Sequence, residues 1–325
     1  MSSVAGAPPA LAEDDRPRGR SARSGAPRRS DRARQEARLG MLLCAPAVLV
    51  LVAVVGYPIL QAVWDSLFSY RLTNPDAREF NGLANYALIL TDPIWWQALG
   101  VTVLITVITV AIELVLGFGL ALVMNHALKT LRPALRTAIL IPYAIITVVS
   151  AFAFLYMFDL TSGFVNSWLP FVADGKDWFA TFGSAVSVII LSEIWKTTPF
   201  ISLLLLSGLA QVPGDLAEAA KVDGATAWQR LWRVTIPNMK AAIMVALLFR
   251  TLDAFRIFDN IFIMTNGAAG TESVAFLAYR QTIQRLEIGV GSAVSVLLTI
   301  LVALIALLFV KGFKVNLAAS TRGGR

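Results

Sequence analysis

A run of charged residues interrupts one of the most apolar stretches of the chain. Its members follow one another at three-residue intervals, with an amide directly after: Arg250, Asp253, Arg256, Asp259 and Asn260. Ionisable groups at membrane depth are costly, so they pair with one another or face a polar interior. Opposite charges three residues apart can pair along a helix. The run is therefore either a self-neutralising ladder or a set of hydrogen-bonding groups that lines a polar path.

A second polar segment, residues 213–237, precedes this stretch and predicts two short helices joined by a turn. Pro213 suits the first turn of a helix, and Asp215 complements the positive end of its dipole. Gly224 then favours a left-handed backbone that ends the helix. One face of this first helix carries small and apolar residues at helical spacing, namely Leu216, Ala219 and Ala220.

The second short helix is predicted to begin at Thr226, a possible N-cap, and to stop at Pro237. It is amphipathic, with an aromatic face formed by Trp228, Leu231 and Trp232. The pattern alone leaves two interpretations open. The segment is either a contact surface for another protein or a linker that rests on lipid head groups.

Composition favours a membrane protein and excludes several chemistries. Hydrophobic residues make up 57% of the 325 residues, charged residues make up 15%, and the mean hydropathy is +0.68. Soluble domains are closer to a quarter charged. His126 is the only histidine and Cys44 the only cysteine, so histidine-based metal sites and serine–histidine–aspartate triads are excluded. We expect no catalytic set and no metal site, and hence no enzyme.

Six apolar runs are long enough to cross a bilayer, which takes roughly 20 residues. Loops that would face the cytoplasm carry more lysine and arginine than the opposite loops, which favours two cytoplasmic termini. We therefore expect an all-α polytopic membrane protein. Its spans are predicted at about 40–64, 98–124, 136–158, 183–208, 239–264 and 290–311.

The chain can be divided on the same grounds. An outer segment, 80–97, reads as an interfacial helix with Trp95 and Trp96 in an aromatic belt. The net charge of +7 is concentrated in the N-terminal tail, but no aromatic residue interleaves its arginines, so lipid is favoured over nucleic acid. The predicted divisions are a disordered arginine-rich tail (1–39), a first span with an outer segment (40–97), a core (98–312) with a cytoplasmic loop at 209–238, and a C-terminal tail (313–325).

The cytoplasmic loop resembles a known signature. Glu218-Ala219-Ala220, three residues, Gly224, nine residues and Val234-Thr235-Ile236-Pro237 is similar to the EAA motif of ABC importer permeases. Valine and isoleucine at the two aliphatic places are conservative departures. The resemblance extends over about 40–315 and is strongest to the type I permeases of maltose and glycerol-phosphate importers. Within these it is nearest to the A-type permease of trehalose importers.

The resemblance implies a type I ABC importer permease fold and a transport mechanism. In this family the first helix of the loop docks in a cleft of an ATPase subunit, whose ATP-driven closure turns the paired permeases outward. The chain has no phosphate-binding loop of its own, so ATP and Mg²⁺ belong to the partner. The residues expected to couple to the ATPase are Leu216, Glu218, Ala219, Ala220, Asp223 and Gly224, whereas residues 228–237 are expected to anchor the loop to its own bundle.

The implied assembly contains a second permease, which forms a heterodimer with this chain, two copies of the ATPase and an extracytoplasmic sugar-binding protein. Its place is the bacterial plasma membrane, and the charged run at 250–260 would bond to sugar hydroxyls. Glu113 and the pair Glu193 and Lys196, which would neutralise one another, are weaker candidates. The alternative is a secondary transporter driven by an ion gradient, which would show internal repeats and broken mid-membrane helices.

Overall fold

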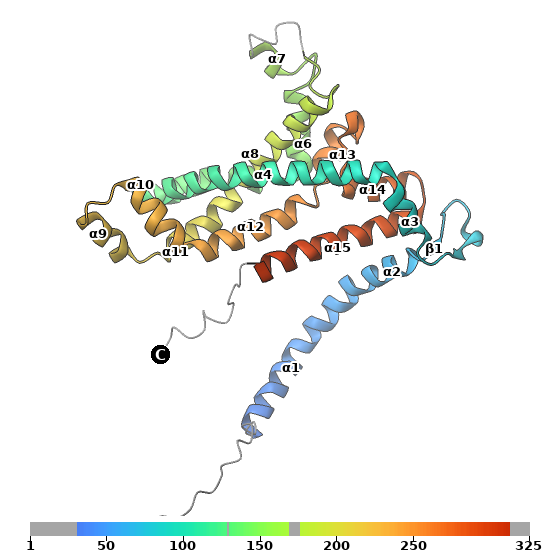
Figure 1. Cartoon of the computed structure of the whole chain (residues 1–325), viewed down its shortest axis with the longest axis horizontal. Helices are drawn as coiled ribbons and strands as arrows, with labels where there is room; N and C mark the ends of the chain where they lie inside the picture. Colours follow the sequence, from blue (N-terminus) through green and yellow to red (C-terminus); the bar gives the residue numbers. More distant parts are fainter. Residues whose placement is uncertain (1–30, 129, 169–175, 313–325) are drawn as a thin grey trace, which may run out of the picture. The chain divides into compact units, whose positions relative to one another are not determined.

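The computed structural model describes residues 31–128, 130–168 and 176–312, which are almost entirely helical (Figure 1). The chain divides into two units, Met1–Tyr57 and Pro58–Arg325. In the first unit, residues 31–39 belong to a helix, and the rest of the predicted N-terminal tail lies outside the described residues. The predicted C-terminal tail, 313–325, lies outside them as well.

The elements follow one another in an order that alternates long apolar helices with short connecting ones. Turns of π- or 3₁₀-helix are labelled η. In chain order they are α1 (Asp31–Leu51), η1 (Val52–Gly56), α2 (Tyr57–Asp65), β1 (Phe68–Ser69), η2 (Pro75–Ala77), β2 (Glu79–Phe80), α3 (Ala84–Thr91), α4 (Pro93–His126), α5 (Arg132–Ala144), α6 (Thr147–Met157), α7 (Phe164–Trp168), α8 (Phe182–Leu209), α9 (Gly214–Val222), α10 (Ala227–Arg230), η4 (Leu231–Thr235), α11 (Ile236–Asn238), α12 (Lys240–Ala254), α13 (Asp259–Met264), η5 (Ala268–Gly270), α14 (Val274–Tyr279), η6 (Arg280–Gln284) and α15 (Ile288–Gly312).

Among the described residues, four helical stretches are long and apolar enough to cross a membrane, namely Arg38–Asp65, Pro93–His126, Phe182–Leu209 and Ile288–Gly312. They coincide with the first, second, fourth and sixth predicted spans. A bent pair of helices, α5 and α6, makes five if it is counted as one span. The full set of six spans stays a prediction.

The third predicted span is not one continuous helix. It consists of α5 and α6, which meet at an angle of 83°. Ile145 and Ile146 between them have extended backbone angles, with ψ values of 133° and 138°. β-Branched residues favour that conformation, and Pro142 removes a backbone donor one turn earlier.

The fifth predicted span is also broken. Helix α12 ends at Ala254, and α13 begins only at Asp259. The break leaves the carbonyl of Ile257 without a helical partner, and the buried hydroxyl of Ser273 donates a hydrogen bond to it at 2.8 Å. Irregular backbone at membrane depth is tolerated where protein groups satisfy it in this way.

The outer segment differs from the predicted interfacial helix at 80–97. It holds α3 and the first turn of α4, which Asp92 caps by accepting from the amide of Ile94. Trp95 is only 3% exposed and packs in a core cluster, so the prediction that it lies in an aromatic belt was wrong. Trp96 is exposed, and its indole donates to the carbonyl of Leu90 at 3.0 Å.

The core of the second unit centres on the packing of α4 against α8. Gly117 of α4 lies directly against Ile201 of α8, where an added Cβ would meet the isoleucine Cγ2 at 2.7 Å. Gly119, two residues on, faces open space in this chain. The glycine at 117 therefore permits the close approach of the two helices.

A matched pair of substitutions tests this contact. We expect Gly117→Leu to destabilise the protein by about 1–3 kcal/mol, because the added side chain forces α4 away from Ile201. Gly119→Leu, with nothing within 4 Å of the new Cβ, should leave stability nearly unchanged. Thermal unfolding of the protein in detergent measures both, and equal losses for the two variants would contradict the packing described.

Candidate functional site

The first candidate site is the loop that carries α9, and its local structure follows the prediction. Pro213 is the N-cap of α9, Asp215 lies in the first turn and Lys221 in the last. Gly224 has a φ of +78°, in the left-handed region. Its amide donates to the carbonyl of Lys221, and the next amide donates to the carbonyl of Ala220 at 2.9 Å. These two bonds are the Schellman pattern, which satisfies the last carbonyls of a helix.

The second helix of the loop begins as predicted, and helical turns continue from α10 through η4 and α11 to Asn238, beyond the predicted end. Thr226 caps it, and the side chain of Gln229 returns a bond to the Thr226 amide, which completes a capping box. The prediction that Pro237 ends the helix was wrong. Pro237 lies in the first turn of α11, where its missing amide proton is not needed, and the chain turns at Met239 instead.

The predicted coupling residues lie together on the surface of this unit. Leu216 is 43% exposed, although it is apolar. Glu218, Ala219, Asp223 and Gly224 are also exposed, and Ala220 is half-buried. Helix α9 therefore presents an exposed face with small residues on which another surface can approach closely.

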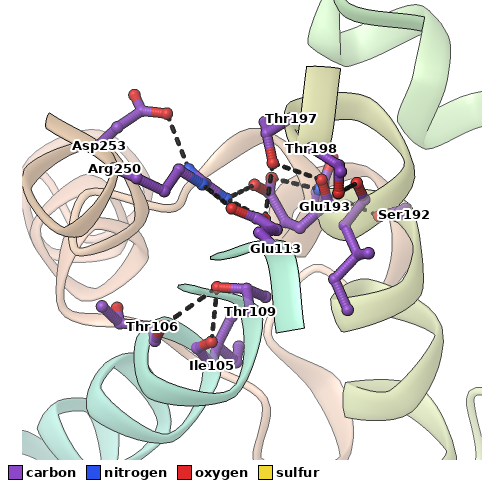
Figure 2. A network of polar contacts seen from close by, with 12 residues as sticks. Ile105, Thr106, Thr109, Glu113, Ser192, Glu193, Thr197, Thr198, Arg250 and Asp253 are labelled. Atoms are coloured by element: carbon purple, nitrogen blue, oxygen red, sulfur yellow. Dashed lines mark hydrogen bonds and ion pairs between the residues drawn. The ribbon is translucent and has the colours of Figure 1, made fainter. Parts of the chain in front are cut away.

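The second candidate site is a buried ionic network centred on Arg250 of α12 (Figure 2). The guanidinium is 1% exposed. It donates from Nε and Nη2 to both carboxylate oxygens of Glu113, at 2.5 and 2.9 Å. Nη2 also donates to Glu193 at 2.7 Å, and Nη1 donates to Asp253 at 2.8 Å. All three guanidinium nitrogens are thus used, by side chains from three helices.

Neutral side chains extend the network to a fourth helix. Thr197 donates to Glu113 at 2.7 Å. Asn260, at the start of α13, donates to Glu193 at 2.7 Å and to Ser192 at 3.1 Å. Because α4, α8, α12 and α13 all contribute, the network fixes the broken fifth segment to the rest of the bundle.

Several predictions about these charges need correction. Only Arg250 and Asp253 pair along a helix, because α12 ends before Arg256 and Asp259. Glu193 bonds to Arg250 and not to Lys196. The prediction treated Glu113 and Glu193 as minor candidates, yet both are central. The sequence did contain a signal for Glu113, because a lone carboxylate in an otherwise apolar span requires a cation from another helix.

A cavity of about 390 Å³ opens beside the network. Of the predicted pathway residues, Arg250, Asp253, Arg256 and Asp259 line it, whereas Asn260 does not. Arg250 is almost fully covered, so it supports the wall, while the Asp253 side chain is 64% exposed. The remaining lining residues come from α5, α6, α8 and the break after α12: Tyr143, Thr147, Glu193, Lys196, Thr197, Ile257 and Phe258.

The lining residues offer hydrogen-bond donors, acceptors and aromatic rings together. The ammonium of Lys196 lies 5.6 Å from the centre of the Tyr143 ring. Within the described part of the chain, Lys196 has no carboxylate within ion-pair distance. A cavity of this kind can bind a neutral, polyhydroxylated ligand, whose hydroxyls both donate and accept.

The comparisons with known proteins identify the family. A family model described as "Binding-protein-dependent transport system inner membrane component" matches residues 113–322. Because the match covers well over half of the chain, the chain belongs to this family. The predicted resemblance to ABC importer permeases is confirmed.

Curated relatives cover nearly the whole chain. The "Trehalose transport system permease protein SugA" of Mycobacterium tuberculosis is 48% identical over 290 residues, 89% of this chain and 93% of that protein. The "Trehalose/maltose transport system permease protein MalF" of Thermococcus litoralis is 36% identical over 280 residues, 85% of this chain and 94% of that protein. The predicted nearness to trehalose permeases is thereby confirmed as a likeness.

Solved structures show the same fold. A chain of a bacterial ABC transporter involved in the import of the acidic polysaccharide alginate matches with a TM-score of 0.74. The match covers 88% of this chain and 100% of that one, at 20% identity. This likeness supports the permease fold and no finer property.

Proposed function

We propose that the chain is the transmembrane permease subunit of an ATP-binding cassette sugar importer in the bacterial plasma membrane, with six spans and both termini in the cytoplasm. Family membership and the functions of the relatives support this proposal. The chain is then a transport subunit and not an enzyme. It would form half of the translocation pathway, with a second permease supplying the other half.

The observation that carries the coupling role is the preformed unit of α9, Gly224 and α10. Its exposed face offers Leu216, Ala219 and Glu218 to a partner. We propose that α9 docks on a separate ATPase subunit, two copies of which bind ATP and Mg²⁺. ATP-driven closure of those subunits would then move the bundle through the rigid loop. An extracytoplasmic sugar-binding protein would deliver the substrate.

For the substrate, we propose a disaccharide, and trehalose in particular. The cavity beside Arg250 offers exposed charged groups and the rings of Tyr143 and Phe258 for a sugar. In the reconstituted complex, we expect a non-reducing disaccharide with its binding protein to raise ATPase activity. Stimulation by monosaccharides or glycerol phosphates alone would contradict the proposed substrate.

Lys196 tests the cavity directly. We expect Lys196→Ala to raise the KM for sugar uptake about ten-fold, because a charged hydrogen bond is worth roughly 1.5–3 kcal/mol. Basal ATPase activity should not change. Lys311→Ala, at the end of α15 and outside the cavity, is the control. An unchanged KM in the Lys196 variant would place the sugar elsewhere.

The alternative of an ion-driven secondary transporter predicted broken mid-membrane helices, and the fifth segment is indeed broken. The break therefore does not discriminate between the two functions. Family membership favours the ATP-driven importer, and the alternative leaves the exposed α9 unit without a role.

A further inference from the structure

The second half of the loop exposes an aromatic and basic face that the proposed function leaves unused. Trp228 and Trp232 are 67% and 53% exposed. Their rings contact one another edge to face, with centroids 5.5 Å apart. Arg233 and Lys240 are exposed beside them in the sequence. We call these four residues the aromatic–basic face.

The opposite side of the same segment is seated on the bundle. Leu231, Val234 and Ile236 are half-buried, and Met239 is 1% exposed within a core cluster. The expectation that 228–237 anchors the loop to its own bundle therefore holds for the aliphatic residues. It does not hold for Trp232, which is 53% exposed, whereas Trp228 lines a cavity with Leu122 and His126 of α4.

The charges of the loop are divided at Gly224. On its N-terminal side, α9 and its cap hold three acidic residues and one lysine. On its C-terminal side, residues 227–240 contain three basic residues and no acidic one. Within the described chain, neither Arg233 nor Lys240 has a carboxylate partner, and neither indole of the face donates a hydrogen bond. The two halves thus suit partners of opposite charge.

The position of the face also points to a particular partner. Only Met239 separates α11 from α12, whose sequence after Lys240 is apolar. In Figure 1, α10 and α11 run across the end of the bundle where α12 begins. Residues of α4, α9 and α10 line one cavity, so α9 and α10 lie beside the C-terminal end of α4. Tryptophan and basic residues at such a boundary are typical of the membrane interface.

We propose that the aromatic–basic face inserts into the head-group layer of anionic phospholipid. The indoles would donate to head-group oxygens, and the basic groups would be attracted by the negative lipid surface. The face would hold α9 at a fixed depth relative to the membrane. This inference rests on the proposed function for the cytoplasmic placement of the loop.

A spin-label experiment tests the contact with lipid independently of transport. In a Cys44→Ser background, Trp232→Cys is labelled with a nitroxide and the full complex is placed in nanodiscs with nickel-chelating head groups. Val222→Cys on α9, where the native side chain is 87% exposed, is the matched control. We expect faster relaxation of the label at 232 than at 222. Equal relaxation of the labels at 232 and 222 would overturn the proposal. So would a label at 232 that becomes protected only when the ATPase subunit is present.

A lipid titration tests the role of charge. We expect Arg233→Gln to raise the fraction of phosphatidylglycerol needed for half-maximal ATPase activity about five-fold, because one arginine near an anionic surface contributes about 1 kcal/mol. Arg233→Lys should behave as the wild type. An Arg233→Gln variant with an unchanged lipid requirement would overturn the proposal. Failure of the proposed function would differ, since the wild-type complex would then show no sugar-stimulated ATPase activity in any lipid.

Discussion

Replacing Arg250 with glutamine is expected to destabilise the folded bundle by about 3–5 kcal/mol, because it leaves buried carboxylates without their cation. Glu113 is completely buried, and Glu193 is nearly so. In water these groups would be solvated, but in the bundle no other arginine or lysine of the described chain bonds to them. The loss should appear as a lower unfolding temperature in detergent and as little protein in the membrane.

Two further variants test whether the lost stability comes from the unpaired buried carboxylate or from the loss of an arginine at this cavity. Arg256→Gln removes an exposed arginine from the same cavity, and we expect its stability to match the wild type. The double variant Arg250→Gln/Glu113→Gln removes one buried charge of each sign, so it should recover part of the lost stability. If the single and double variants unfold at the same temperature, the ion pair is not what holds α12 to α4.

A second large effect is expected at Gly224. Its φ of +78° is costly for any residue with a Cβ, by about 1–2 kcal/mol, and more for a β-branched one. Gly224→Val should therefore unwind the Schellman turn and misdirect α9. We expect sugar uptake by the complex to fall at least ten-fold while the membrane bundle stays folded, which uptake assays and unfolding curves measure together.

Gly214→Val provides the matched control for this substitution. Gly214 begins α9 with a negative φ, and an added Cβ there meets nothing within 4 Å. We expect uptake close to that of the wild type. Equal losses for both variants would mean that the loop tolerates no larger residue, irrespective of its backbone.

The structure of the loop at 209–238 could be predicted from sequence because its determinants are local. Pro213, Gly224 and Thr226 fix two helix starts and one helix end between residues 213 and 226. Hydropathy likewise located the long apolar helices. Hydropathy could not locate the break after Ala144, since the residues around it are as apolar as a continuous span. The break after Ala254 lies between the charged residues Asp253 and Arg256, so the signal there was charge.

The polar network could not be predicted for a different reason. Its bonds join residues far apart in the chain, 137 residues for Arg250 and Glu113 and 57 for Arg250 and Glu193. The three-residue spacing of the charges left open whether they pair along one helix or line a polar path. Pairing along the helix stops at Asp253, because α12 ends one residue later, and Arg256 and Asp259 line the cavity.

The most direct test of the central proposal is co-purification of the chain with an ATPase subunit, together with uptake by the same cells. We predict that the wild-type chain retains the ATPase through detergent extraction. Glu218→Ala, in the exposed face of α9, should lose both the ATPase and uptake. Glu79→Ala, in the exposed strand β2, should lose neither. An ATPase that never co-purifies, with uptake unchanged by Glu218→Ala, would contradict the proposal that this loop couples ATP hydrolysis to transport.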